Sequence, residues 1–159
     1  MRGKIVCVSM LLMCATAAAD AERFVRKLAL PDGRTAVVAE GDLEARSIGS
    51  YSVRVYSGDD TTFYEAGVVM ARDGVVEDIR LADLDGKGRQ QLVVIIRSAG
   101  TGGYLSAQAF AFPNKEVEAR SHVDGLPADA DPVAALTRTT RSDKVLGKGK
   151  YHDPNGGAR

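Results

Sequence analysis

Short stretches of alternating or continuous apolar residues recur along the chain and are separated by glycine- and aspartate-rich turns. Alternation with a period of two is typical of strands with one buried face, and a short continuous β-branched run is typical of a strand inside a sheet. The alternating stretches cover 24–30, 35–39, 51–56, 63–72, 75–81 and 105–112, the continuous run covers 92–96, and a weaker candidate covers 116–123. The pattern predicts an all-β domain of about eight antiparallel strands, arranged as a sandwich or a small barrel.

Two turns in this pattern predict hairpins. The turn Pro31-Asp32-Gly33-Arg34 separates the first two stretches. Proline presets φ there, and glycine takes the positive-φ corner. The dipeptide Asp73-Gly74 separates 63–72 from 75–81, and we expect it to join them as a second hairpin.

Two other segments are assigned from local sequence. Residues 40–50 are polar and show no sustained periodicity, so we expect a loop. Asp131 can cap a short helix that begins at Pro132 and ends at Arg138. In the strand 51–56, alternation places one set of side chains inward and the other set outward: Tyr51, Val53 and Val55 inward, and Ser52, Arg54 and Tyr56 outward.

The two ends of the chain differ from the strand region. Residues 1–19 combine Arg2 and Lys4, an apolar stretch and an Ala-x-Ala site, as in a bacterial secretory signal. Cleavage after Ala21 is a second option. Residues 140–159 carry five basic and two acidic side chains and few large apolar ones, too few to offset the entropy of ordering. We therefore predict a signal peptide at 1–19, one β domain at 20–139 and a disordered basic tail at 140–159.

Composition narrows the classes of partner and chemistry. The chain has 21 basic and 21 acidic residues, and the signal removes two basic ones. This balance argues against nucleic acid, which needs a concentrated basic face, and the signal is too short for a membrane anchor. Both cysteines, Cys7 and Cys14, lie inside the signal. The mature chain is therefore expected to fold without disulfides. It is also expected to have neither a zinc site nor a thiol nucleophile.

The segment between 92–96 and 105–112 is the strongest candidate for a functional loop. It contains three glycines, two hydroxyl side chains and a tyrosine, in the order Ser98-Ala99-Gly100-Thr101-Gly102-Gly103-Tyr104. Glycines allow positive φ and close approach of the backbone to another surface, and tyrosine is a frequent interface anchor. We expect a rigid hairpin that presents a thin, hydroxyl-bearing loop.

This loop resembles the inhibitory loop of the periplasmic lysozyme inhibitors, which share a Ser-Gly-x-Tyr or Ser-Gly-x-x-Tyr motif. The pattern of the branch that inhibits invertebrate-type (I-type) lysozymes falls on Thr101-Gly102-Gly103-Tyr104, with threonine in place of serine. The resemblance covers about residues 22–137. Other stretches similar to this branch are Val38–Gly41, Arg46–Tyr51, Gly74–Asp78 and Leu126–Pro132.

The resemblance implies a secreted, periplasmic β-sandwich that is not an enzyme, uses no cofactor and plugs a lysozyme cleft stoichiometrically. Glycoside hydrolysis uses two carboxyl groups, one of them protonated. Thr101 would hydrogen-bond to such a carboxyl, supported by Ser98, while Tyr104 would cover apolar cleft wall. The glycines that keep the loop thin are Gly100, Gly102 and Gly103. I-type lysozyme is favoured, C-type and G-type stay open, and the resemblance also admits a homodimer.

A calcium-stabilised β module with a binding or scaffolding role is the main alternative. Asp83-Leu84-Asp85-Gly86-Lys87 resembles the calcium loops of FG-GAP repeats in integrin-type propellers. Calcium takes six to eight oxygens, however, and Lys87 stands where that family has an acidic or amide ligand. Gln91 replaces the later carboxylate. The other interpretation is that Asp83 and Asp85 accept backbone hydrogen bonds and stiffen a turn.

The remaining polar and aromatic groups indicate no strong site. Ser121, His122 and Asp124 superficially resemble a hydrolase triad, but on one strand such residues face opposite ways or lie too far apart for a relay. The pairs Asp59-Asp60 and Glu77-Asp78 are interpreted as solvated charges. A carbohydrate platform would need four aromatic residues whose spacing fits strand packing better: Tyr51, Tyr56, Phe63 and Tyr64.

Overall fold

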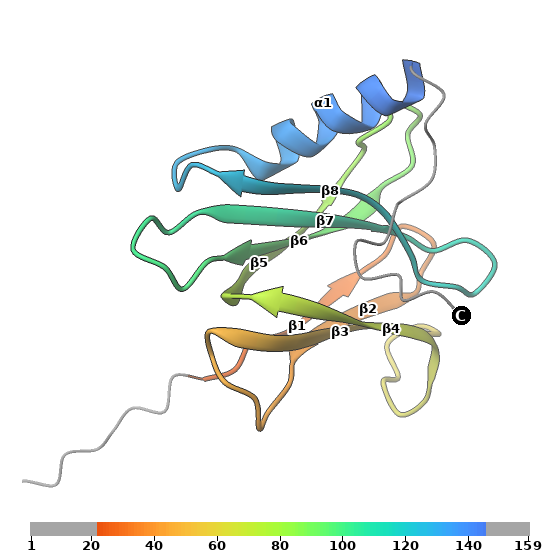
Figure 1. Cartoon of the computed structure of the whole chain (residues 1–159). Helices are drawn as coiled ribbons and strands as arrows, with labels where there is room; N and C mark the ends of the chain where they lie inside the picture. The colour runs from red at the N-terminus through yellow and green to blue at the C-terminus, as the bar shows by residue number, and fades with distance from the viewer. Residues whose placement is uncertain (1–21, 146–159) are drawn as a thin grey trace, which may run out of the picture.

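A computed structural model describes residues 22–145 as two stacked antiparallel sheets with a helix against one of them (Figure 1). The first sheet has the order β1-β2-β3-β4 and the second the order β5-β6-β7-β8. The strands are β1 (Val25–Ala29), β2 (Thr35–Glu40), β3 (Ile48–Tyr56), β4 (Tyr64–Asp73), β5 (Val75–Ala82), β6 (Gln91–Arg97), β7 (Leu105–Ala111) and β8 (Glu118–Leu126). This confirms an all-β fold of eight strands, and it is the sandwich rather than the barrel.

The main core lies between the two sheets. Tyr51, Val53 and Val55 of β3 point into it as predicted and are at most 1% exposed. Tyr56 was expected to face outward but is also buried, at the point where the ladder to β4 shifts register. From β6, Leu92, Val94 and Ile96 reach the same core, whereas Val93 and Ile95 belong to a second core on the other face. Strand β6 is therefore buried on both faces, which explains its uninterrupted apolar sequence.

The second core lies under helix α1 (Pro132–Val145), which covers the outer face of the second sheet. Leu136 is fully buried there, a burial worth about 2 kcal/mol. The Asp131 carboxylate accepts hydrogen bonds from the backbone N–H groups of Val133 (2.9 Å) and Ala134 (3.2 Å) and caps the helix as predicted. No helix within residues 22–145 is long and apolar enough to span a membrane.

One of the two predicted hairpins is confirmed and the other is wrong. Residues 31–34 join β1 to β2, with Ala29 opposite Thr35. Gly74 instead carries the chain from the first sheet to the second, because β4 pairs with β3 and β5 pairs with β6. Gly74 has φ of +115°, and a methyl group built on it would lie 2.0 Å from the carbonyl oxygen of Arg97. Only glycine fits this crossing.

Two further boundaries differ from the predictions. The expected loop at 40–50 is shorter, because β3 already begins at Ile48. Ile48 pairs with Asp73 of the long strand β4. Helix α1 ends at Val145 instead of Arg138 and so enters the segment predicted to be a disordered tail. The signal at 1–19 and the rest of the tail, 146–159, lie outside the described residues.

Candidate functional site

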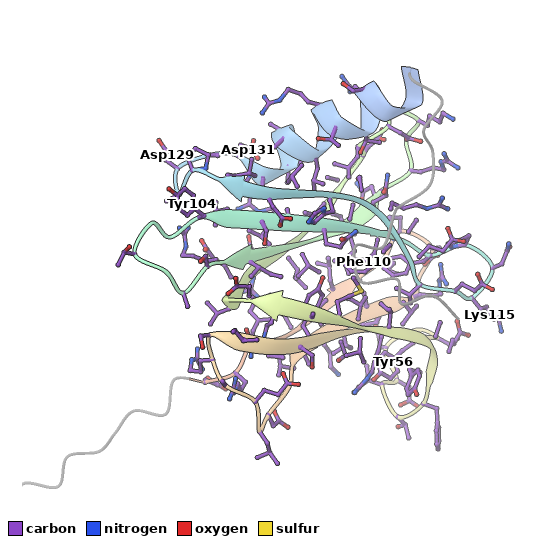
Figure 2. All side chains as sticks on the ribbon, viewed as in Figure 1. Tyr56, Tyr104, Phe110, Lys115, Asp129 and Asp131 are labelled. Carbon is purple, nitrogen blue, oxygen red and sulfur yellow. The ribbon has the colours of Figure 1, made fainter. Side chains whose placement is uncertain are left out.

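Loop 98–104 connects β6 to β7 at one end of the sandwich, where Figure 2 places Tyr104 near Asp129 and Asp131 of the β8–α1 connection. The N–H of Ser98 donates to the carbonyl oxygen of Tyr104 (2.8 Å) and closes the neck of the loop. Within the loop, the N–H of Gly103 donates to the carbonyl oxygen of Gly100 (3.1 Å). These backbone bonds make the segment a compact hairpin end, as the sequence predicted.

The loop leaves polar groups free at its surface. Thr101 is exposed and Tyr104 is 55% exposed, and neither side chain makes a hydrogen bond with another residue of the described region. The hydroxyl of Ser98 instead accepts a hydrogen bond from the N–H of Gly100 (3.2 Å) and so shapes the loop from within. The side chains of Thr101 and Tyr104 are therefore available at the surface of the loop, whereas the hydroxyl of Ser98 is used within it.

The three glycines of the loop are not equivalent. Gly103 has φ of +53°, which disfavours any other residue. A methyl group on Gly102 would lie 2.3 Å from Cε2 of Tyr104, whereas one on Gly100 would meet only the Ser98 hydroxyl, at 3.5 Å. Gly103 is thus favoured by its backbone conformation, whereas a side chain at position 102 would require the exposed Tyr104 ring to move.

An ion pair at the base of the loop was missed by sequence reasoning. Arg97 Nη2 donates to the Glu77 carboxylate (2.8 Å), its Nε also contacts that carboxylate, and its Nη1 donates to the carbonyl oxygen of Gly103 (2.9 Å). The hydrogen bonds that Arg97 donates to the Glu77 carboxylate raise the pKa of Arg97. Glu77 is therefore a paired residue, whereas the sequence suggested a merely solvated charge.

A hollow of about 340 Å³ lies beside the loop. Its lining includes Arg97 and Leu105, the residues immediately before and after loop 98–104. Its far wall is the β8–α1 connection, which approaches closely enough that a methyl group on Gly103 would lie 3.9 Å from Cβ of Ala128. A partner that surrounds loop 98–104 would therefore also cover this hollow.

The aspartates of the alternative calcium loop already have partners. Asp83 accepts backbone N–H groups from Gly86 (2.8 Å), Lys87 (3.2 Å) and Gly88 (2.8 Å). Asp85 accepts the N–H of Lys87 (3.1 Å) and an N–H of Arg89 (2.8 Å). These hydrogen bonds agree with the interpretation that the two aspartates stiffen the turn. Within residues 22–145, no group of three or more His, Cys, Asp or Glu side chains is arranged to hold a metal ion.

The triad-like residues of β8 do not form a relay. His122 Nε2 lies 2.5 Å from Asp124 Oδ2, so the expectation that these residues are too far apart was wrong for this pair. Residues two apart share one face of a strand, which explains the contact. Ser121 points elsewhere, and its hydroxyl accepts a hydrogen bond from the Thr140 hydroxyl of α1 (2.9 Å).

Comparison with known proteins identifies the family. The family model of the periplasmic lysozyme inhibitor of I-type lysozyme matches residues 22–140. The crystal structure of PliI-Ah, such an inhibitor from Aeromonas hydrophila, shares 40% identity at a TM-score of 0.66, covering 71% of this chain and 98% of that one. The structure of A. hydrophila PliI in complex with Meretrix lusoria lysozyme shares 40% identity at a TM-score of 0.65, covering 71% and 94%. A search of curated proteins found no match.

The matched region contains all eight strands and the whole of loop 98–104. The comparison thus agrees with the resemblance drawn from the sequence, both in the loop Thr101-Gly102-Gly103-Tyr104 and in its extent of about residues 22–137. The chain belongs to the family of periplasmic lysozyme inhibitors of I-type lysozyme.

Proposed function

We propose that this chain is a stoichiometric inhibitor of I-type lysozyme, not an enzyme, and that it acts by inserting loop 98–104 into the active-site cleft. The observation that carries the proposal is the complex of the 40% identical A. hydrophila PliI with Meretrix lusoria lysozyme. The loop geometry supports it, because a backbone-braced hairpin end leaves Thr101 and Tyr104 available to a partner.

The chemistry of a lysozyme cleft suits these two side chains. One of the two carboxyl groups that flank the scissile bond is held protonated, and the other is ionised. The Thr101 hydroxyl can donate to the ionised group or accept from the protonated one, in the place of a sugar oxygen. Tyr104 presents a flat ring to apolar wall and a phenol to a polar neighbour.

The choice of enzyme class rests on the surroundings of the loop. Its tip offers a hydroxyl and a phenol, which any lysozyme cleft could accept. Discrimination between I-, C- and G-type enzymes then comes from contacts around it, where wrong partners meet clashes or unpaired charges. The charged hollow bounded by Arg97 and Asp129 lies in that position.

The test is cell-wall lysis by purified I-, C- and G-type lysozymes, each titrated with the chain lacking residues 1–19. We expect inhibition of the I-type enzyme to saturate near an equimolar ratio. Tyr104→Ala and Thr101→Ala should each weaken it. Phe63→Ala is the matched control, since Phe63 is an 85% exposed aromatic residue just before β4, at the opposite end of the sandwich. Unchanged inhibition by both loop variants would contradict the insertion mechanism.

A further inference from the structure

The ladder between β5 and β6 contains a bulge beside loop 98–104. Val75 pairs with Arg97 and Val76 with Ile96, but the next pair is Asp78 with Ile95, so Glu77 has no cross-strand partner. A bulge of this kind redirects a side chain that a regular ladder would place elsewhere. Here the extra residue is the one whose carboxylate holds the guanidinium of Arg97.

Arg97 is held at its backbone as well as at its side chain. Its carbonyl oxygen packs so closely on Gly74 that a methyl group there would lie 2.0 Å away. With its backbone and two of its nitrogens fixed, Arg97 directs Nη1 at the carbonyl oxygen of Gly103, the residue that precedes Tyr104. Arginine suits this role, because its planar group can bind a carboxylate with two nitrogens and still donate from the third.

We propose that Glu77 and Arg97 are positioning residues, which hold loop 98–104 in its inserting conformation before the enzyme binds. This inference rests on the proposed function and specifies how the loop achieves it. A loop that is already ordered loses less conformational entropy on binding, so the pair contributes affinity through the loop, in addition to its place in the hollow. The glycines make the tip of the loop flexible, and the pair compensates by fixing the base of the loop.

The variants Arg97→Gln and Glu77→Gln test the proposal in titrations against an I-type lysozyme. We expect the inhibition constant to rise about three- to tenfold for Arg97→Gln. The rise should be smaller for Glu77→Gln, which keeps the donor to Gly103. Arg89→Gln is the matched control, because Arg89 also pairs with a carboxylate, that of Asp85 at 2.8 Å, but lies at the other end of the β5–β6 hairpin and does not line the hollow. It should change inhibition less than about twofold.

Two readouts separate positioning of the loop from general stabilisation. In a Tyr104→Ala background, the effect of Arg97→Gln should shrink towards none, because a misplaced loop then has less to lose. Amide hydrogen exchange of Arg97→Gln should quicken at residues 100–104, while the amides of β6 and β7 keep their protection.

Unchanged inhibition by Arg97→Gln would overturn the proposal. So would an equal loss in both backgrounds together with faster exchange throughout β6 and β7, since Arg97 would then be a general structural residue. If the unaltered chain inhibits no lysozyme, the proposed function fails instead. The exchange measurement alone then decides whether the pair orders the loop.

Discussion

The ring of Tyr104 lies across Gly102, so that a methyl group built on this glycine would be 2.3 Å from Cε2 of the ring. The orientation of the exposed tyrosine ring in loop 98–104 therefore depends on the absence of a side chain at Gly102. Gly102 is not among the glycines with positive φ, which means that the ring, and not the backbone, excludes a side chain at this position.

Gly102→Ala should displace the Tyr104 ring and weaken lysozyme inhibition by about tenfold. A loss of this size is what the removal of one modest interface contact produces. The Tyr104 ring is exposed and can swing aside, so the melting temperature should stay within a few degrees. Gly100→Ala is the matched control, because its new methyl group meets the Ser98 hydroxyl at an ordinary 3.5 Å. Equal inhibition by the two variants would show that the ring position does not matter.

Gly74→Ala should destabilise the fold strongly. Its methyl group would meet backbone atoms of Arg97 and Ser98, which cannot move aside as a side chain can. We expect a loss of about 3 kcal/mol or more in the free energy of unfolding, measured by urea denaturation. Gly33→Ala provides the comparison, since Gly33 also has positive φ (+84°) but no atom lies within 4 Å of its new methyl group. Its cost should be about 1–2 kcal/mol, from the backbone conformation alone.

Arg72→Met should unbalance a buried charge. The side chains of Arg72 and Glu40 are 0% and 1% exposed and lie 3.7 Å apart. Arg72 also donates to the carbonyl oxygens of residues 45, 46, 50 and 74. The loss should be about 3–5 kcal/mol in urea denaturation, because Glu40 is left buried without its cation. Arg72→Met combined with Glu40→Gln should recover part of this loss, and no recovery would contradict the role of the pair.

Glu44 should make the fold sensitive to acid. The hydroxyl and the N–H of Ser50 both donate to its carboxylate and lower its pKa from the ordinary glutamate value of 4.5. A lowered pKa stabilises the folded state above that value, and this stabilisation is lost as the pH falls through the lower pKa of the folded state. The melting temperature of the unaltered chain should exceed that of Glu44→Gln at about pH 7 and approach it at about pH 3. A constant difference would count against the prediction.

Excess chelator should leave the melting temperature unchanged. The carboxylates of Asp83 and Asp85 are already occupied by backbone N–H groups and by Arg89. A calcium-stabilised module would instead lose several degrees. A drop that added calcium reverses would return the calcium alternative to consideration.

The sequence predicted the strands well, because their apolar positions repeat with a period of two or run continuously. It could not distinguish the two uses of an Asp-Gly turn. Gly33 and Gly74 both have positive φ, but of the two only Gly33 sits in a hairpin, whereas Gly74 is a crossing because β4 pairs with β3 and β5 with β6. Those pairings join residues far apart in sequence, and no local pattern encodes them.

The loop itself was found from its composition, whereas its base was not. Glu77 follows two valines in what reads as a regular strand, and the bulge that turns it towards Arg97 has no local signal. The same holds for Arg72 and Glu40, since a charge in a strand normally marks the solvent face. Helix α1 was underestimated because, among its side chains up to residue 142, the apolar ones that reach the second core lie in the first turns, namely Val133 and Leu136.

Every strand pairs only with its neighbours along the chain, and among the described strands the chain passes from one sheet to the other once, at Gly74. Such local pairing favours rapid folding, and the first four strands can form their ladder without any strand of the second sheet. The base of loop 98–104 nevertheless depends on Gly74, at the crossing, and on Glu77, which follows it. The loop therefore takes its shape only where β5 has paired with β6, and the capacity to bind depends on the second sheet and not on the first-sheet ladder alone.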